Sequence, residues 1–452
     1  MTQPQRTHPL TPLVSSVRTI GFIVVGLLAF GGGALGRLAS SLGSLPAVLV
    51  GVLALAALVG LVVGLEYLSW TRTTFHFDDA GDFRLDSGVL QRTQRRLAVS
   101  RLQSVDVVRP LLGRVVGLSQ LRIEVAGGGD SHVVLSYLLD AQAQALRDEI
   151  IARAAGVAPD AGAAPELVLA AVPTRDLVVS LLLRSETLLL ALVSVAVVGA
   201  IMVTEGAGGL AVLLVTGGVP LLGVFTQFSR FFGFTLADSP DGLRLRHGLA
   251  SVQAQTVPPG RIQAIEVAQP LLWRSHDWVR VRMNVAGTAG GEDDTHSERV
   301  LLPVAPREVA EAVLARVLPG VDLAAVPLQA AGASARRRAW LQWRSLAVGN
   351  DGQVLVARRG FLTRSLSIVP HARTQSVRVT QGPWQRALGL ASVHVDPTPG
   401  PVHVVGLHRG AGDARRIAEA QLLRAAAARR AAAPERWMAP GAPPDDSPLA
   451  GR

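Results

Sequence analysis

Four long uncharged, largely apolar runs separate membrane-like parts of the chain from water-like parts. These runs hold 18, 28, 18 and 24 residues and are Thr19–Gly36, Leu38–Leu65, Thr187–Thr204 and Gly206–Ser229. A helix needs about 20 residues to cross a hydrocarbon core. The pattern therefore predicts two transmembrane hairpins, at residues 17–68 and 184–229. A signal peptide is the less favoured interpretation of the first run, because a second apolar run follows it at once.

The polar segments contain a threefold repeat with constant spacing. In each copy a glycine (Gly88, Gly248 or Gly360) is followed thirteen residues later by Arg-x-Gln, and a further arginine stands thirteen residues beyond. The repeated polar residues are Arg101, Gln103 and Arg114; Arg261, Gln263 and Arg274; and Arg373, Gln375 and Arg386. Apolar residues alternate on both sides of these anchors, which predicts strands, and each glycine marks a hairpin turn where a positive φ carries no steric cost.

Each repeat closes with a predicted helix. Asp140, Pro306 and Asp413 stand where the helices 141–154, 307–317 and 414–432 begin. Strands followed by one terminal helix predict a small α+β module, in which a curved antiparallel sheet or barrel is capped by the C-terminal helix.

The predicted fold class is therefore mixed, with four transmembrane helices in two hairpins and three α+β domains. The predicted order is a cytoplasmic tail (1–16), hairpin 1 (17–68), domain 1 (69–155), a linker (156–183), hairpin 2 (184–229), domain 2 (230–318), a linker (319–338), domain 3 (339–432) and a disordered tail (433–452).

Four spans return the chain to its starting side, so the N-terminus and all three domains share one compartment. Arginines near the span ends lie mainly on that side, with Arg37 alone on the other. The positive-inside rule then places the domains in the cytoplasm and the spans in the plasma membrane.

The repeat resembles the bacterial type 2 pleckstrin-homology (PH) domain. Its first copy carries the closest match, in Arg101, Gln103, Ser104, Val105, Arg114, Gly117 and Leu118. The order of two spans, one domain, two spans and two domains is similar to the YdbT-like multi-pass membrane proteins. The second copy departs from the motif at Asp277 and Trp278, and the third at Thr374. The resemblance implies a PH-like fold for each copy. It does not by itself establish a lipid ligand.

The repeated arginines and glutamines permit two interpretations. In the first they are architectural and bind carbonyls or a carboxylate such as Asp106 or Glu266. In the second they form a site for an anionic group such as a lipid phosphate.

Charge changes the picture for the last domain. The chain has a net charge of +10, and residues 331–452 hold 18 arginines against 7 acidic residues, compared with 26 and 27 in residues 1–330. With neighbouring tryptophans, these arginines predict contact with the anionic inner leaflet. The candidate membrane-surface residues are Trp273, Trp384, Arg336, Arg337, Arg338, Trp340 and Trp343, with Trp273 expected to be the most exposed. An acidic protein partner or a merely solvated surface are the alternatives. No nucleic-acid motif accompanies the charge, so nucleic acid is not an expected partner.

Enzymatic motifs are missing from the sequence. The chain has no lysine for a phosphate loop and no cysteine, and we expect no cofactor and no metal. The preferred function is a non-enzymatic scaffold that presents three PH-like modules to membrane lipids and to an unidentified protein. An accessory or regulatory subunit of a transport or export system is the alternative. Ionisable residues inside the spans would favour that alternative, and the predicted spans contain none. A homo-oligomer is left open.

Overall fold

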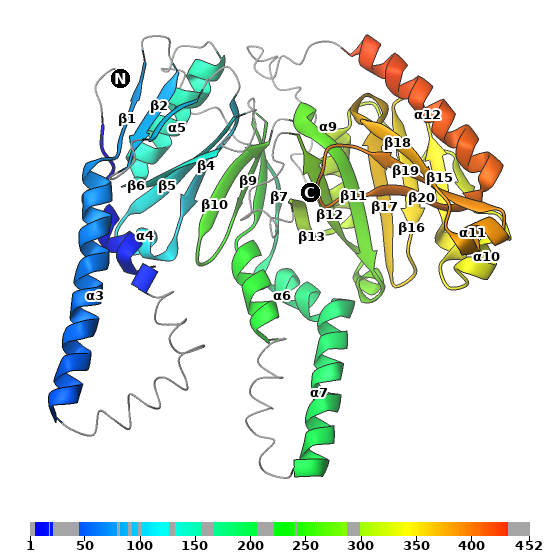
Figure 1. The fold of residues 1–452 in the computed structure, drawn as a ribbon. Coiled ribbons are helices and arrows are strands. Elements are labelled where there is room, and N and C mark those ends of the chain that lie inside the picture. Colours follow the sequence, from blue (N-terminus) through cyan, green and yellow to red (C-terminus); the bar gives the residue numbers. More distant parts are fainter. Residues whose placement is uncertain are drawn as a thin grey trace. The chain divides into compact units, whose positions relative to one another are not determined.

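The computed structural model divides into two compact units, 1–161 and 162–452. It describes residues 5–17, 19–20, 45–78, 82–88, 93–97, 102–125, 132–155, 167–205, 221–239, 242–257, 259–286 and 299–432. Figure 1 shows the strands and helices of both units. Unit 1 contains the first repeat, and unit 2 contains the second and third.

Unit 1 is built from two antiparallel three-stranded groups and a C-terminal helix. Helix α3 precedes the strand order β1-β2-β3, and the order β6-β5-β4 follows before α5. The elements are α3 (Leu45–Thr71), β1 (Thr74–Phe77), β2 (Phe83–Ser87), β3 (Thr93–Leu97), β4 (Leu102–Arg109), α4 (Leu111–Val115), β5 (Leu118–Val125), β6 (His132–Leu139) and α5 (Asp140–Ala155). Alternate residues of these strands and Ile150 of α5 form its core. The strands predicted beside the first Arg-x-Gln and the helix predicted after Asp140 are confirmed.

The strands of the second module lie on both sides of an apolar helical segment in the sequence. Strand β7 lies before that segment in the sequence, and the strands that continue its sheet in the order β10-β9-β8-β7 lie after it. The elements are β7 (Leu167–Ala171), α6 (Thr174–Leu182), α7 (Ser185–Glu205), β8 (Thr235–Ser239), β9 (Gly242–His247), β10 (Val252–Val257), η3 (Pro259–Arg261), β11 (Ile262–Pro270), η4 (Leu271–His276), β12 (Trp278–Val285), β13 (Val300–Pro306) and α9 (Arg307–Val317). Pro306 precedes α9, as predicted.

The third module follows without another apolar segment. Its elements are β14 (Leu328–Ala330), α10 (Ala335–Arg338), η6 (Trp343–Ser345), β15 (Ala347–Asn350), β16 (Val354–Arg359), β17 (Thr363–Pro370), η7 (His371–Arg373), β18 (Ser376–Thr380), α11 (Pro383–Ala387), β19 (Leu390–Asp396), β20 (Val404–Gly410) and α12 (Ala411–Ala431). Helix α12 begins two residues before Asp413. Asp413 is therefore inside the first turn, where it pairs with Arg416.

The three repeat glycines occupy the predicted turns. Their φ angles are +115° at Gly88, +119° at Gly248 and +94° at Gly360. A Cβ at Gly360 would stand 1.9 Å from the carbonyl oxygen of Thr363. Only glycine fits here, because any side chain would meet backbone as well as a disfavoured φ.

Modules 2 and 3 share one seven-stranded sheet, in the order β13-β12-β11-β17-β16-β15-β14. Strand β11 pairs antiparallel with β17 from Ile265↔Ile368 to Pro270↔Thr363. This pairing joins the modules through backbone hydrogen bonds, which explains why they form one compact unit.

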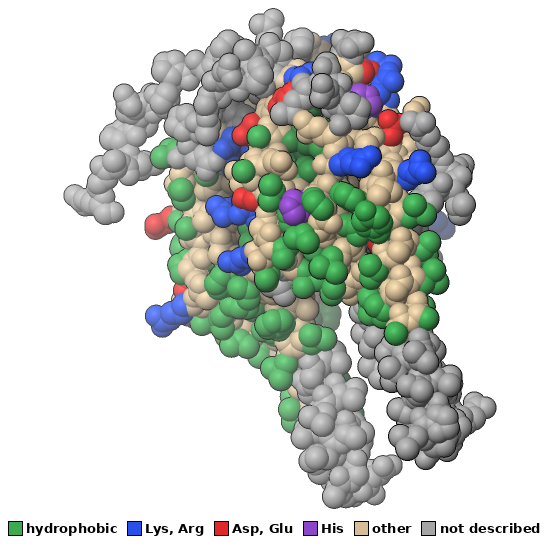
Figure 2. All heavy atoms as spheres, turned by 90° about the vertical axis from the view of Figure 1, so that its left-hand side faces the viewer, with side chains coloured by type: hydrophobic (Ala, Val, Ile, Leu, Met, Phe, Trp, Pro, Cys, Tyr) green, Lys and Arg blue, Asp and Glu red, His purple; other side chains and the backbone are tan. Residues whose placement is uncertain are grey.

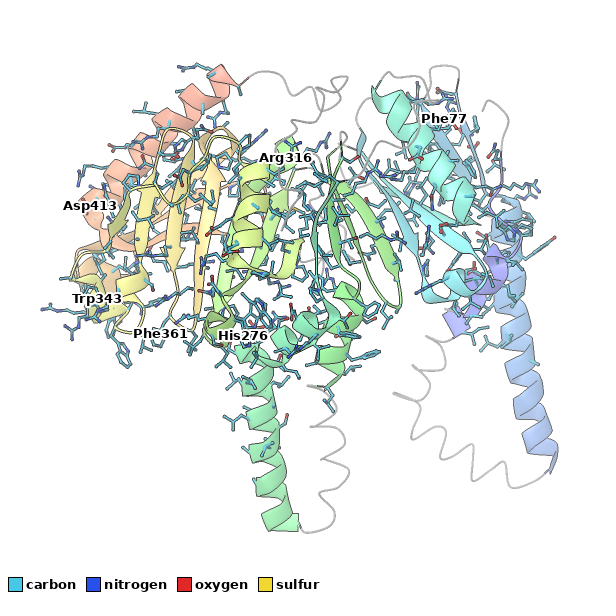
Figure 3. The ribbon with its side chains drawn as sticks, turned by 180° about the vertical axis from the view of Figure 1, so that it is seen from behind. Phe77, His276, Arg316, Trp343, Phe361 and Asp413 are labelled. Carbon is cyan, nitrogen blue, oxygen red and sulfur yellow. The ribbon has the colours of Figure 1, made fainter. Side chains whose placement is uncertain are left out.

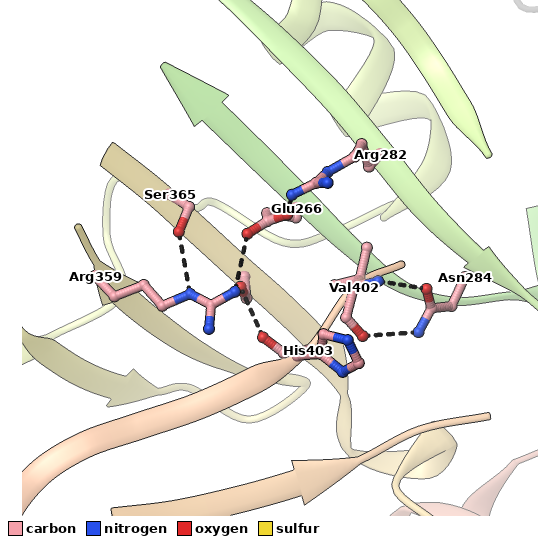
Figure 4. Close-up of polar contacts among 8 residues, drawn as sticks. Glu266, Arg282, Asn284, Arg359, Ser365, Val402 and His403 are labelled. Carbon is pink, nitrogen blue, oxygen red and sulfur yellow. Dashed lines mark hydrogen bonds and ion pairs between the residues drawn. The ribbon is translucent and has the colours of Figure 1, made fainter. Parts of the chain in front are cut away.

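A buried carboxylate lies at this junction (Figure 4). Glu266 of β11 is 1% exposed and is paired with Arg282 of its own module and with Arg359 of module 3, whose Nη2 lies 3.3 Å from its Oε1. Arg359 also donates from Nε to the Ser365 hydroxyl at 3.3 Å. Glu266 thus has one cationic partner from each module.

Asn284 of β12 makes a second polar contact between the modules. Its Oδ1 accepts the Val402 N–H at 2.8 Å, and its Nδ2 donates to the carbonyls of Val402 and Thr398 at 2.9 and 3.1 Å. These bonds hold the β19–β20 connection of module 3 against module 2.

The predicted spans are only partly covered by the described residues. Most of Thr19–Gly36 and of Gly206–Ser229 falls outside them. Within the described helices, none alone has both the length and the hydropathy of a span, whereas α6 and Ser185–Val197 of α7 satisfy both criteria together, with a 52° bend between them. The four-span arrangement stays a prediction.

Gly360→Ala should destabilise unit 2 by about 1–3 kcal/mol, the cost of holding a residue in a sparsely populated backbone region. Gly352→Ala is the matched control, because no atom lies within 4 Å of its Cβ position. Thermal unfolding of the full chain in detergent measures both variants, and equal melting temperatures would contradict the assignment.

Glu266→Ala should destabilise unit 2 by about 3–5 kcal/mol, because Arg282 and Arg359 lose the carboxylate that compensates their charges. Glu419→Ala removes an exposed carboxylate from the middle of α12 and should change stability by less than about 0.5 kcal/mol. Denaturant unfolding in detergent distinguishes the two. If the two variants unfold at the same denaturant concentration, the buried Glu266 pairs do not stabilise unit 2.

Candidate functional site

The repeat residues are not gathered into one pocket. Arg101 lies outside the described residues, as does the side chain of Gln103, and Arg114 is exposed. Arg261 and Arg373 are half-buried, and burial lowers the pKa of each guanidinium from its usual value. Gln263 is buried and donates to the Arg261 carbonyl at 3.3 Å, whereas Gln375 is exposed. In module 2 the glutamine therefore closes a local loop. Anion binding by these residues stays a prediction.

The turn after each second repeat arginine has one conformation in all three modules. Gly117, Asp277 and Gly389 have φ angles of +70°, +47° and +65°. The carbonyl of each accepts the N–H of the first residue of the module's C-terminal helix, at 3.2, 3.0 and 2.8 Å. The turn thus positions the helix that closes the module.

Asp277 keeps this turn although it replaces glycine. Aspartate tolerates the left-handed region better than most residues. Its carboxylate also accepts from Gln269 Nε2 and from Arg307 Nε, both at 3.1 Å. The departure from the motif therefore changes the residue without changing the backbone.

Arg274 binds the hairpin turn of the next module. Its Nη2 donates to the carbonyl of Phe361 at 2.6 Å and, more weakly, to that of Leu362 at 3.5 Å. Burial and the nearby charge of Arg364 lower the pKa of Arg274. The second repeat arginine of module 2 is therefore a contact between modules.

The prediction that Trp273 is exposed is wrong. Trp273 is 2% exposed, packs edge-on against Trp278 with ring centroids 6.4 Å apart, and donates from Nε1 to the Ser180 carbonyl of α6 at 3.0 Å. Its neighbours Leu271 and Leu272 are 42% and 41% exposed instead. Helix η4 thus turns its tryptophan into the core and its leucines to the surface.

The exposed leucines belong to a row of apolar residues on unit 2. Three hydrogen bonds hold the segments that carry these residues. Trp273 donates to α6, Arg274 donates to the Phe361 carbonyl, and the Ser345 hydroxyl donates to the Gly360 carbonyl at 2.5 Å. We call this row the apolar rim and define it as Leu271, Leu272, Trp340, Leu341, Phe361 and Leu362, which are 41–73% exposed.

Segments that carry the apolar rim lie on the side from which α7 extends. Figure 3 shows His276, Phe361 and Trp343 along that side, with Arg316 and Asp413 farther from it. Trp343 is half-buried and Trp340 is 73% exposed. Exposed α7 residues, including Leu189, Leu192 and Val195, continue the apolar surface along the helix.

Arginines flank Trp340, a residue of the rim, in the sequence. Arg336, Arg337 and Arg338 are exposed on α10, directly before Trp340. The guanidinium of Arg344 lies 5.6 Å from the centre of the Trp343 ring, within cation–π range. Trp384, which was also predicted to contact the membrane, is 74% exposed on α11.

Unit 1 has exposed apolar residues of its own. Leu61, Leu65 and Tyr67 of α3 are 57–60% exposed. Figure 2 shows hydrophobic side chains gathered at the face that it presents.

Residues on either side of each apolar segment pair with one another. In unit 1, Gln5 and Phe75 exchange backbone hydrogen bonds of 2.8 and 2.9 Å, and Trp70 Nε1 donates to the Thr7 carbonyl at 3.1 Å. In unit 2, β7 pairs with β8 from Leu167↔Asp238 to Ala171↔Thr235. Each apolar segment therefore begins and ends at one sheet of its own unit.

A cavity of about 330 Å³ lies beside α9. Leu314, Leu318, Leu323 and Leu366 give it an apolar lining, and Arg307, Glu311 and Asp322 are its charged residues. It could hold a small apolar group. None of the repeat arginines or glutamines lines it.

Each of the three repeats forms two groups of antiparallel strands and ends with one helix. This arrangement defines a protein of the PH-like class. The family model for the bacterial PH domain matches residues 22–154, 187–321 and 313–431, which together cover most of the chain. The chain belongs to the bacterial PH domain family. The first two matches begin in the apolar runs, so the family pattern includes those segments together with the sheets.

A curated relative is similar over a short stretch. The UPF0699 transmembrane protein YdbT of Bacillus subtilis (strain 168) is 27% identical over 106 residues. The aligned stretch covers 23% of this chain and 21% of the relative.

Trp273→Ala should destabilise unit 2 by about 3–5 kcal/mol, because it leaves a cavity and removes the bond to α6. Trp384→Ala removes an equally large side chain from the surface and should cost less than about 0.5 kcal/mol. Thermal unfolding of the two variants in detergent provides the comparison, and a smaller loss at Trp273 than at Trp384 would refute the packing described above.

Proposed function

We propose that this chain is a non-enzymatic membrane scaffold of the plasma membrane. Its apolar segments enter the bilayer, and its PH-like modules lie on the cytoplasmic side, with the apolar rim of unit 2 against the inner leaflet. The relative named as a transmembrane protein supports a membrane location. Strand pairing across both apolar segments supports hairpins that return to their starting side.

The apolar rim is the observation that carries the proposal. Six large apolar side chains of unit 2 are 41–73% exposed, and Figure 3 shows one of them, Phe361, on the side from which α7 extends. In water, so many neighbouring exposed apolar residues are unusual for a monomer and mark a contact with protein or membrane. An apolar helix that enters the bilayer from this side would bring the rim to the interface, where leucine, phenylalanine and tryptophan are stabilised by partial burial.

Arginines beside the rim add a charge term. Arg336, Arg337, Arg338 and Arg344 are exposed close to Trp340 and Trp343. Each arginine near an anionic leaflet contributes about 1 kcal/mol of attraction. Their guanidinium groups can remain at headgroup level while the apolar side chains enter the acyl region. The ligand class is therefore an anionic lipid surface.

Quenching of Trp340 fluorescence by brominated lipids tests the leaflet contact. The full chain is reconstituted in vesicles with brominated acyl chains, and Trp340→Phe should remove a strongly quenched component. Trp278→Phe, which removes an 8% exposed ring, should not. Replacement of Arg336, Arg337 and Arg338 by glutamine should weaken the contact in anionic vesicles, by about fivefold per arginine.

Two arginines at the other end of unit 2 supply the charge control. Arg424 and Arg430 lie on α12, whose C-terminal end points away from the side where α7 extends (Figure 1). Their replacement by glutamine should leave the quenching unchanged. Equal quenching before and after Trp340→Phe would refute the leaflet contact, and equal effects of the two arginine sets would refute the charge term.

A further inference from the structure

Strand β18 at the end of the third module has an open edge. It pairs with β19 on one side, and within the described residues no strand pairs with its other side. Four of its five residues are exposed, including Val379 at 41%. An uncovered strand edge presents backbone donors and acceptors that another strand can pair with.

The same edge is occupied in the second module. Gly248 and Gly360 are 112 residues apart, and at that spacing β18 corresponds to β11, whose edge holds β17. The occupied junction has three components: strand pairing, the contact of Arg274 with the Phe361 and Leu362 carbonyls, and the Glu266–Arg359 pair.

Arg386 corresponds to Arg274. Arg386 is exposed, and in the described part of the chain its side chain has no hydrogen bond or ion pair. It can therefore donate to the carbonyls of an incoming hairpin turn as Arg274 does. Module 3 keeps both the strand edge and this donor, and the described residues contain no strand or hairpin turn that uses them.

Charge differs between the two edges. Arg378 stands where module 2 has Glu266, and it forms two bonds of 2.7 and 3.0 Å with Asp396 at the surface. A hairpin that docks here should carry an acidic residue in place of Arg359.

This charge argues against a second copy of the chain as the occupant. In the β11–β17 register Glu266 lies opposite Ser367, seven residues after Gly360. If the module 1 hairpin of a second copy docked here, the equivalent residue would be Arg95, seven residues after Gly88. Ser87 would stand in place of Arg359. Arg378 would then lie opposite another arginine, which destabilises strand pairing.

We propose that the β18 edge binds a β-hairpin from a PH-like module of another polypeptide. The hairpin pairs antiparallel with β18, its turn carbonyls accept from Arg386, and an acidic side chain at the place of Arg359 contacts Arg378. This partner class extends the proposed scaffold role. The two proposals fail separately, because no residue of β18 belongs to the apolar rim.

An appended fourth module tests the edge in the full chain. A copy of residues 319–432 that carries Arg359→Glu is placed after Ala432, which repeats the direct succession of modules 2 and 3. Amide hydrogen exchange of Ser376–Thr380 should slow at least tenfold relative to the chain without the copy. A copy that keeps Arg359 should protect these amides less, and Arg378→Glu in the host module should reverse that preference.

A disulfide provides a second readout, since the chain contains no cysteine. In the expected register Thr380 lies opposite Ser365 of the copy, so Thr380→Cys and Ser365→Cys should form a disulfide. Thr380→Cys with Ser367→Cys in the copy is the misaligned control. Arg386→Gln should reduce the protection without altering β19 or β20.

Three results would overturn the proposal. The first is unchanged exchange at β18 together with no disulfide in the extended chain. The second is equal protection by the Arg359 and Glu copies. The third is protection of β18 in the unextended chain that disappears on dilution, which would identify a second copy as the occupant.

Discussion

The pairing of β11 with β17 is the interaction on which unit 2 depends. It makes one sheet out of two modules, and it brings Arg359 to a carboxylate that is buried at 1% exposure. An unpaired buried charge costs several kcal/mol, so Glu266 is fully compensated only when both modules are folded. Stability in this unit is therefore shared between two repeats. The same junction also positions part of the apolar rim, because Arg274 holds Phe361 and Leu362 beside η4.

Much of each module could be predicted from the sequence, because the relevant forces are local. The glycines before each Arg-x-Gln occupy positive-φ turns, and the alternating segments on both sides of the anchors form strands. Even the departure at Asp277 preserves its turn, since an aspartate can adopt the same backbone. The threefold repeat also led to the correct family, because order and spacing survive where single residues do not.

The candidate site was harder to predict because its contacts are distant in sequence. The buried position of Trp273 depends on Ser180, which lies 93 residues earlier and belongs to α6. A tryptophan without an apolar counterpart in the other repeats predicted exposure, although its neighbours Leu271 and Leu272 carry the exposed surface. The role of Arg274 likewise depends on a turn 87 residues later. The 112-residue spacing between the anchors of the second and third repeats was the available signal for that junction, but the contacts follow only from the strand register.

Strand β7 has a consequence for the order in which the protein is made. It precedes α6 and α7 in the sequence, yet its pairing partner β8 begins only at Thr235. During synthesis β7 must remain without its partner until residues 172–234 have been translated. The sheet of module 2 can therefore close only after these residues have been made, and in unit 1 Gln5 must likewise wait for Phe75. Each finished sheet then holds the two ends of its apolar segment together.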